Sequence, residues 1–379
     1  MKEADAAPAS FLRGLFAAAL AAADPARCVP GCLPPPISRI GRTVVVGAGK
    51  AAAAMARAVE GQWPGDLDGF VVVPYGYALP CRRIEVVEAA HPVPDAAGMA
   101  AAERALASVA GLTEDDLVLA LISGGGSALL ALPAPGVTLA QKQAVTRQLL
   151  KCGASIHEIN TVRKRLSAIK GGRLAVAAWP AAVETLVVSD VPGDDPADVA
   201  SGPTVADHSS DAEALAVLAR YRVEAPALNS PPPADDPRFG RCRARVIASG
   251  MTALEAAAAE ARRRGVTPIV LGDRVEGESR EVARAMAAQA LLCAAESAAG
   301  RPSVLLSGGE TTVTVKGRGR GGRNTEFLLA LAIALRGAPG IHAIACDTDG
   351  IDGTADNAGG IIGPTTLARA EAAGLDAAA

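Results

Sequence analysis

A buried strand that runs straight into three consecutive glycines constrains this chain most. Residues 117–130 read LVLALISGGGSALL, so an unbroken apolar run precedes the glycines and helix-compatible residues follow them. Because glycine lacks a Cβ, the backbone here can adopt positive φ and direct its N–H groups toward an anion. A strand-to-helix turn without a ligand is the alternative. The predicted ligand-binding residues of this loop are Ser123, Gly124, Gly125, Gly126 and Ser127.

A second glycine turn lies earlier in the chain, after the apolar run at residues 43–46. Gly47 and Gly49 flank one alanine, and Lys50 begins an alanine-rich segment that predicts a helix. A lysine at the N-terminus of a helix opposes the helix macrodipole, so it gains no stability from that position. We therefore interpret Gly47 and Gly49 as cofactor-binding residues and Lys50 as a catalytic cation.

This turn matches neither of the two common nucleotide-binding motifs completely. A P-loop requires a glycine where Val44 stands and a hydroxyl group where Ala51 stands. The G-x-G-x-x-A spacing of a dinucleotide site is present, but the next strand ends in Pro74 and Tyr75 instead of a ribose-binding acid. The sequence therefore disfavours NAD.

Two capping boxes predict helices in tandem, one beginning at Thr138 and the other at Ser155. The second helix is expected to run to Gly171 and to carry Lys170 on a polar face. We interpret Lys170 as cofactor-binding, and a solvated charged face is the alternative. His91, which precedes a proline before an earlier helix, is expected to be a structural hydrogen-bonding residue.

Acidic residues follow the strand predicted at residues 184–189. Asp190 and Asp194 come just after this strand, and ligands of open α/β sheets bind at the carboxyl ends of the strands. Carboxylates at such a position suit Mg²⁺ or a substrate hydroxyl group. We interpret both residues as magnesium ligands and Asp190 also as a catalytic residue.

The C-terminal third of the chain contains two more segments in which glycines adjoin charged residues. Gly308, Gly309 and Glu310 follow another apolar run and are interpreted as a further cofactor-binding loop. The loop at residues 316–323 is too basic to be buried without an anion, and a solvated loop is the alternative. Its last residue, Arg323, precedes a predicted helix and is the predicted catalytic arginine.

Length and composition predict a two-domain α/β protein. At 379 residues the chain exceeds the size at which a single core usually stops growing. The proline-rich segment 231–237 is the best linker, which gives an N-terminal domain at 1–233 and a smaller C-terminal domain at 238–379. A net charge of −3 provides no basic footprint for nucleic acid.

Cysteine usage and the N-terminus predict a cytoplasmic protein that does not enter a membrane. Seven cysteines without a C-x-x-C spacing give neither a disulfide framework nor a zinc site. Glu3, Asp5 and Arg13 do not fit a signal peptide, so this region is expected to form an amphipathic surface helix. No apolar run is expected to reach the ~20 residues of a membrane span.

Eight motifs, in their order along the chain, resemble those of the glycerate 2-kinase family of the type with a C-terminal MOFRL domain. They are GAGKA, HPVPD, LISGGGSALL, HEINTVRKRLSAIKGG, SDVPGDDPADVASGPT, LSGGETTVTV, GRGGRN and DTDGIDGTADNAGG. The resemblance covers nearly the whole chain. It implies a Rossmann-like N-terminal domain, a smaller α/β domain and an active site in the cleft between them. It also implies transfer of the γ-phosphoryl group of ATP to the 2-hydroxyl of D-glycerate with Mg²⁺.

On this resemblance, Lys50 and Arg323 contact the transferring phosphoryl group and the substrate carboxylate. Two departures from the family pattern stand out. Arg165 occupies a position where the family often has histidine, so a proton-transfer role is in doubt there. The family usually continues beyond the position of Ala379 into a T-G-P-T-x-T-N-V segment. A hydroxypyruvate reductase, a label attached to some relatives, and a non-catalytic metabolite-binding protein are the alternative functions.

Overall fold

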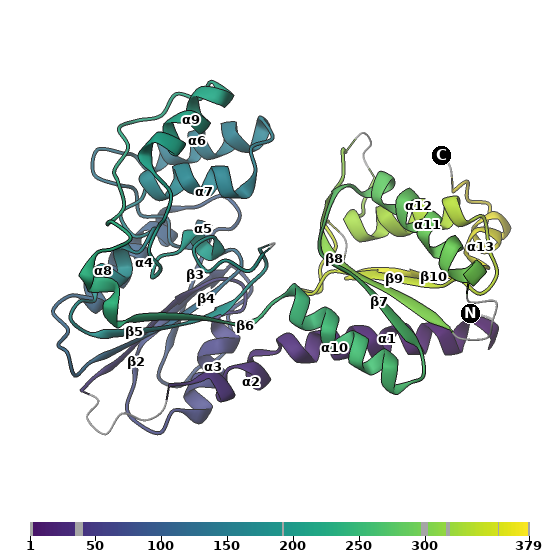
Figure 1. Ribbon diagram of the computed structural model, residues 1–379, viewed down its shortest axis with the longest axis horizontal. Coiled ribbons are helices and arrows are strands. Elements are labelled where there is room, and N and C mark those ends of the chain that lie inside the picture. The colour runs from purple at the N-terminus through teal and green to yellow at the C-terminus, as the bar shows by residue number, and fades with distance from the viewer. Residues whose placement is uncertain are drawn as a thin grey trace. The chain divides into compact units, whose positions relative to one another are not determined.

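The chain forms two compact units (Figure 1). The computed structural model describes residues 3–34, 41–191, 193–296, 302–315, 319–354 and 356–377. The larger unit comprises Ala23–Ser249, and the smaller unit combines Met1–Ala22 with Gly250–Ala379. Each unit contains both helices and strands, which confirms the predicted α/β class with a smaller second domain.

The larger unit is built on a six-stranded sheet in the order β3-β2-β1-β4-β5-β6. Every neighbouring pair in it is parallel. This is the strand order of Rossmann folds, and the order reverses between β1 and β4. Ligands of such sheets bind beyond the carboxyl ends of the strands at the point of reversal. The strands are β1 (Thr43–Ala48), β2 (Asp68–Pro74), β3 (Glu85–Ala89), β4 (Leu117–Ser123), β5 (Ala182–Val188) and β6 (Cys242–Ala248).

Helices cover both faces of this sheet. Every residue of β1 and β4 is buried, as the continuous apolar runs predict for central parallel strands. Val45 packs on one face with Val59 of α3 (Ala52–Gln62), together with residues of α2 (Pro25–Cys28). Val44 packs on the other face with Ala102 of α4 (Ala96–Val109), together with residues of α8 (Arg173–Ala177).

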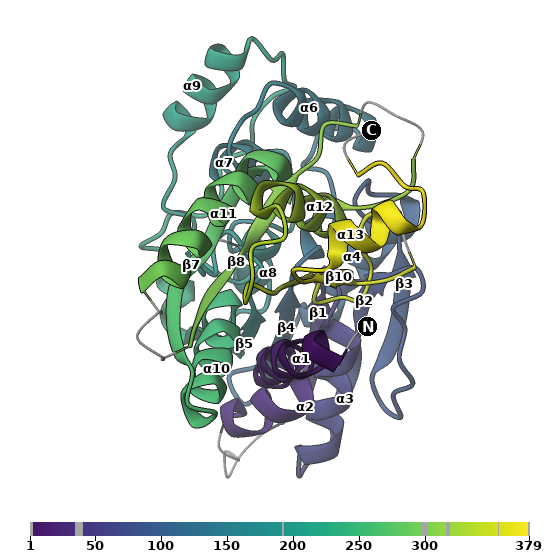
Figure 2. The same ribbon diagram turned by 90° about the vertical axis from the view of Figure 1, so that its right-hand side faces the viewer.

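Three further helices of the larger unit pack on one another and form a separate apolar cluster. They are α6 (Leu139–Lys151), α7 (Ile156–Arg165) and α9 (Asp211–Tyr221), and they lie together in both views (Figures 1 and 2). Both predicted capping boxes are present at the starts of α6 and α7. The expectation that the second of these helices reaches Gly171 is wrong. Beyond Arg165 the chain pairs with residues 132–134 instead, through Ala134 N–H to Leu166 O and Ala168 N–H to Leu132 O (both 3.1 Å).

The smaller unit contains two short sheets. Strands β7 and β8 are parallel, whereas β9 and β10 are antiparallel. Leu328 and Leu331 of α12 form one apolar cluster with Ala283 of α11. Its elements are α1 (Glu3–Ala23), α10 (Gly250–Arg263), β7 (Thr267–Glu278), α11 (Ser279–Glu296), β8 (Ser303–Thr312), α12 (Arg323–Leu335), β9 (Ala343–Cys346), β10 (Gly359–Ile362) and α13 (Thr366–Ala372).

Helix α1 contains a longer apolar stretch than we predicted from the sequence. The stretch Ala6–Ala23 is long enough and apolar enough to cross a membrane by length and composition, a test that core helices and signal sequences also pass. Its Leu15 is buried against Leu254 and Ala258 of α10. The N-terminal helix therefore contributes to the core of the smaller unit.

The boundary between the units differs from the predicted one. The proline-rich segment 231–237 leads into the short helix η3 (Pro237–Arg241) and then into β6, which pairs with β5 of the larger unit. The larger unit therefore extends to Ser249, and the prolines connect elements within it. The remaining short helices of the larger unit are η1 (Pro30–Cys32), α5 (Gly126–Leu129) and η2 (Val199–Ser201).

Candidate phosphate-binding site

The turn after β1 is held by the loop after β4. Gly49 N–H donates to Val72 O (3.0 Å) and Lys50 N–H donates to Gly124 O (2.8 Å). Ala51 N–H donates to Ser123 Oγ (3.0 Å). These N–H groups are the ones that a dinucleotide pyrophosphate would use at this turn. Because they are already engaged, the turn presents the Lys50 side chain and not its backbone.

Two predicted cofactor-binding glycines have packing roles in the structure. Gly49 has φ +136°, and a Cβ there would overlap Ser123. A Cβ at Gly47 would overlap the main-chain carbonyl of Leu121. Both glycines therefore allow close approach of β1 to β4 and its loop, and their contact with a cofactor stays a prediction.

The glycine loop after β4 has the conformation that the sequence predicted. Gly125 has φ +82° and leads directly into α5. Within the described residues, the N–H groups of Gly125, Gly126 and Ser127 have no main-chain acceptor. Successive N–H groups in such a loop form a concave nest that suits an anion.

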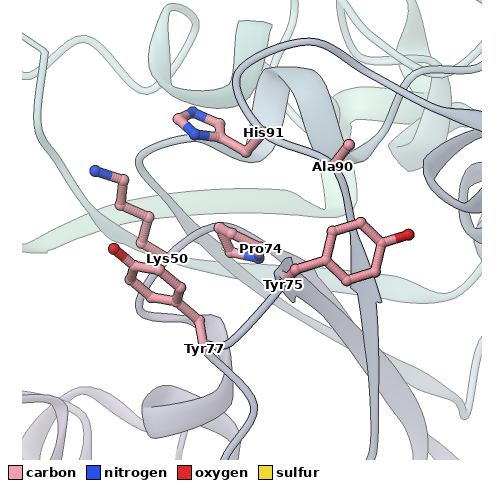
Figure 3. A pocket seen from close by; sticks show the side chains of 6 residues that line it. All are labelled: Lys50, Pro74, Tyr75, Tyr77, Ala90 and His91. Atoms are coloured by element: carbon pink, nitrogen blue, oxygen red, sulfur yellow. The ribbon is translucent and has the colours of Figure 1, made fainter. Parts of the chain in front are cut away.

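Lys50 lines a pocket of about 270 Å³, and Gly125 of the glycine loop lies beside two of the lining residues, Lys50 and His91. Figure 3 shows Lys50, His91 and Tyr77 directed to the same side, whereas Tyr75 points away from them. A methyl group at Gly125 would lie 3.1 Å from His91 Nε2 and 3.6 Å from Lys50 Cγ. The pocket thus brings a lysine and an imidazole to the edge of the loop. Its lining residues are Lys50, Pro74, Tyr75, Tyr77, Ala90 and His91.

His91 and Tyr77 line the pocket and were not among the predicted binding residues. His91 lies two residues after the end of β3, and its expected structural role stays a prediction. Tyr77 follows the end of β2. The available signal was their position just past strands of a parallel sheet, where ligands bind.

Asp190 also lies at the glycine loop. It follows β5, and a Cβ at Gly124 would overlap its carboxylate. Asp194 lies four residues further on with φ +56°, and its N–H donates to Val191 O (3.1 Å). The described residues contain no group of three or more potential metal ligands. One carboxylate beside a phosphate-binding loop suits Mg²⁺, which takes its other ligands from phosphates and water.

A hydrogen-bonded chain connects the glycine loop to α7. Ser127 Oγ lies 2.5 Å from Ser201 Oγ. Ser201 Oγ donates to Asn160 Oδ1 (3.0 Å), and Asn160 donates to the main-chain carbonyl of Asp198 (3.2 Å). Ser201 and its neighbour Ala200 both have positive φ, at 60° and 52°. Strained backbone of this kind persists where the surroundings fix it, and it often accompanies a functional site.

Lys170 lies behind this part of the loop. It is fully buried, and its Nζ donates to Ala200 O (3.4 Å). The Cβ of Ala200 would in turn lie 2.8 Å from a Cβ at Gly126. The structure therefore places Lys170 close to the predicted loop but not on a solvated helix face, so the solvated alternative is wrong.

Arg165 has a structural role. Its side chain is 1% exposed and forms an ion pair with Asp211 (2.6 Å). It also donates to Ser209 O (2.7 Å) and to Thr161 O (2.9 Å). These bonds attach the end of α7 to the segment before α9. They give this arginine no position from which to transfer a proton at the loop.

The smaller unit holds the other predicted site residues. Gly308 and Gly309 belong to β8, and Gly309 pairs with Val275 of β7, so the expectation of a loop there is wrong. A Cβ at Gly309 would overlap the carbonyl of Val275, which explains why the strand contains glycine. Glu310 forms an ion pair with Arg323.

Arg323 begins α12 and is about one third exposed. Besides Glu310 it binds Asp347, with its Nη2 3.1 Å from the carboxylate. The buried Asp352 accepts the N–H groups of Asn324 and Thr325 (both 2.9 Å) and so caps the helix. The cap fixes the backbone from which the guanidinium extends. Arg318 lies outside the described residues, and Arg320 is exposed.

The fold and the site together define a doubly wound α/β protein with a glycine loop at the reversal of strand order. Residues 11–230 match the family described as a domain of unknown function, DUF4147, and residues 303–379 match the MOFRL family. The D-glycerate 2-kinase of Thermotoga maritima is 40% identical over 90% of this chain and 83% of its own length. The chain therefore belongs to the glycerate 2-kinase family with a C-terminal MOFRL domain, as the motifs predicted.

Two further comparisons extend this result. The crystal structure of a glycerate kinase from Thermotoga maritima matches with a TM-score of 0.84 and 36% identity, over 97% of this chain and 90% of that one. A protein of Agrobacterium vitis is 52% identical over 98% of this chain and 86% of its own length. It bears the name "Putative hydroxypyruvate reductase".

Proposed function

We propose that this protein transfers the γ-phosphoryl group of ATP to the 2-hydroxyl of D-glycerate. The observation that carries the proposal is the meeting of Lys50, the glycine loop and Asp190 at the reversal of strand order. Phosphoryl transfer depends on positioning and on neutralising negative charge more than on a covalent nucleophile. A loop of free N–H groups, a lysine and a carboxylate are the groups that such a reaction uses.

Each group receives a role under this proposal. The N–H groups of Gly125, Gly126 and Ser127 hold nucleotide phosphates, and the Lys50 ammonium neutralises the transferring phosphoryl group. Asp190 would hold Mg²⁺, which would supply positive charge against the phosphates, or it orients the substrate hydroxyl group. Arg323 of the smaller unit binds the substrate carboxylate, because a guanidinium can grip a carboxylate through two parallel hydrogen bonds.

Phosphorus NMR of the reaction mixture tests the proposal. The protein is incubated with D-glycerate, ATP and Mg²⁺, and the expected product is 2-phosphoglycerate. Formation of 3-phosphoglycerate as the sole initial product would contradict the proposed position of transfer. Absence of any phosphorylated glycerate would contradict the reaction itself.

Reduction of hydroxypyruvate is the second candidate, because the Agrobacterium vitis relative bears that name. The structure offers little support for a nicotinamide dinucleotide. The N–H groups after β1 are engaged by Val72, Gly124 and Ser123, and β2 ends in Pro74 without an acid for the ribose. Oxidation of NADH upon addition of hydroxypyruvate, followed by absorbance, would favour this second function over the kinase.

A further inference from the structure

Three cations lie beside the glycine loop without a carboxylate partner. They are Lys142 of α6, Arg163 of α7 and Lys170, which we call the cation cluster. Within the described residues, no carboxylate lies within ion-pair distance of any of them. Lys142 is 3% exposed and Lys170 is fully buried. Charged side chains are rarely buried in this way without a partner of opposite charge.

Among the described residues, the hydrogen-bond acceptors of the cluster are neutral groups. Lys142 Nζ donates to Ala131 O (3.4 Å) and Leu132 O (3.3 Å), just after α5. Leu132 O also accepts Ser167 Oγ (3.1 Å), and Ser167 Oγ accepts the N–H of Lys170 (3.4 Å). The two lysines therefore flank one small group of atoms behind the loop.

The third cation reaches the loop through the hydrogen-bonded chain described above. Arg163 Nη1 donates to Asn160 Oδ1 (3.2 Å), which also accepts Ser201 Oγ. Ser201 in turn contacts Ser127 of the loop. All three cations thus connect to the glycine loop or to residues packed against it.

The next two residues of α7 show the usual arrangement. Lys164 is 3% exposed, like Lys142, but its Nζ lies 3.0 Å from Asp207. Arg165 is paired with Asp207 and Asp211. In the part of the chain that the structure describes, acids therefore pair with Lys164 and Arg165, which hold helices together, but not with the three cations at the loop.

Burial and mutual repulsion lower the pKa values of the two lysines in the cluster. Burial lowers the pKa of Lys142 to about 7, and the positive charges of Arg163 and Arg173 contribute to this shift. Burial, Lys142 and Arg163 likewise hold the pKa of Lys170 well below its ordinary value. A buried cation without a counter-charge destabilises a fold, and an anion that binds nearby removes this penalty.

We propose that the cation cluster is the built-in counter-charge for a phosphoanion carrying two or more negative charges at the glycine loop. Three cations that have no acidic partner among the described residues match a multiply charged anion better than a single carboxylate. The cluster acts across a short, poorly screened distance, so its lysines are positioning residues that need not touch the ligand. The inference deepens the proposed function, because under it the phosphoanion is that of the nucleotide.

The inference predicts an inverse relation between stability and binding. Lys170→Met and Lys142→Met each remove a buried amine whose charged form is disfavoured by burial, so each variant should melt at a higher temperature than the wild type when no ligand is present. Each should also bind ATP and inorganic pyrophosphate about tenfold or more weakly, because a cation has been lost from a poorly screened site. A purely structural role for these lysines would not produce these two opposite changes.

Calorimetry of the full chain supplies both readouts, with Lys164→Met as the matched control. That variant removes a buried lysine with a carboxylate partner, so it should melt at a lower temperature and keep its pyrophosphate affinity. Lower melting temperatures or failure to fold for both loop-side variants would overturn the inference. Unchanged pyrophosphate affinity in both would do so too.

The choice of ligands separates this inference from the proposed function. If ATP and pyrophosphate raise the melting temperature of the wild type but glycerate is not phosphorylated, the cluster stands and the kinase proposal fails. In another outcome, D-glycerate is the one ligand that raises the melting temperature of the wild type but not of the lysine variants. In that case the proposed ligand class, a phosphoanion, is wrong. A wild type that none of these ligands stabilises also overturns the inference.

Discussion

Ser123 Oγ accepts the N–H of Ala51 at 3.0 Å, so the last side chain of β4 holds the turn that follows β1. Ser123 was predicted to bind a phosphate, but its hydroxyl oxygen is directed inward and 1% of the residue is exposed. The hydrogen bond joins the two loops at the reversal of strand order. It therefore fixes the backbone from which Lys50 extends.

Replacing Ser123 by alanine tests this connection. Ser123→Ala leaves the N–H of Ala51 without its acceptor, which should lower the free energy of unfolding by about 1–2 kcal/mol. The kcat of the proposed reaction should fall as well, because Lys50 loses its fixed base. Urea unfolding and steady-state kinetics measure the two effects. Lower stability with unchanged kcat would show that the bond supports the fold alone.

Lys50→Met removes the ammonium group from the pocket. The expected result is a fall in kcat of about 10²-fold or more, since a preorganised charge at the transition state contributes roughly 3 kcal/mol. The melting temperature should change little, because a lysine at the start of a helix does not stabilise it. A variant with normal kcat would remove Lys50 from the catalytic residues.

Alanine substitutions at two glycines with nearly the same φ can distinguish the cost of backbone strain from an effect on the binding site. Gly125 and Gly136 have φ of 82° and 79°, but a Cβ at Gly136 meets nothing within 4 Å. Gly125→Ala and Gly136→Ala should therefore lower the free energy of unfolding by a similar amount, roughly 1–2 kcal/mol each. Only Gly125→Ala should weaken ATP binding in calorimetry, because its methyl group lies against His91 and Lys50. Equal ATP affinity in both variants would make the loop structural.

Arg323→Lys isolates geometry from charge in the smaller unit. Lysine keeps the positive charge but lacks the planar fork that grips a carboxylate. We expect a loss of about 1.5–3 kcal/mol in kcat/KM for glycerate, the range of hydrogen bonds to charged groups, with ATP affinity altered far less. Arg320→Lys is the control, since Arg320 is exposed and lies before the capped start of α12. Equal losses in the two variants would mean that the loop acts only through its charge.

The elements that the sequence predicted correctly depend on neighbours in the chain. The capping boxes at Thr138 and Ser155 each form within the first turn of α6 and α7. The strand, glycine loop and helix at residues 117–130 are equally local, apart from the short length of α5. Such signals lie within a few residues of one another, so a single sequence contains them.

The elements that were predicted wrongly depend on partners far away in the chain. Gly308 and Gly309 lie in a strand because β7 pairs with that segment, and Lys170 leaves the helix because residues 132–134 pair with the chain before it. His91 reaches Lys50 only because β3 and β1 lie in one sheet. None of these pairings has a signature within the segment itself.

The pH dependence of stability should reveal the lowered pKa of Lys142 in the folded chain. Its pKa lies at about 7 in the folded chain against an ordinary value of 10.5, so above pH 7 the unfolded chain binds more protons than the folded one. The free energy of unfolding should therefore rise with pH in this range. Between pH 6 and 8.5 the contribution of Lys142 should be about 2 kcal/mol.

Urea unfolding of the wild type and of Lys142→Met at both pH values measures this contribution as a difference. Other groups that titrate in this range are common to the two proteins and largely cancel. The upper limit of pH 8.5 avoids the thiols of Cys28 and Cys242, whose pKa burial raises to about 11 and which would lower stability at higher pH. If both proteins gain the same stability between the two pH values, Lys142 does not change its protonation state between them and the prediction is wrong.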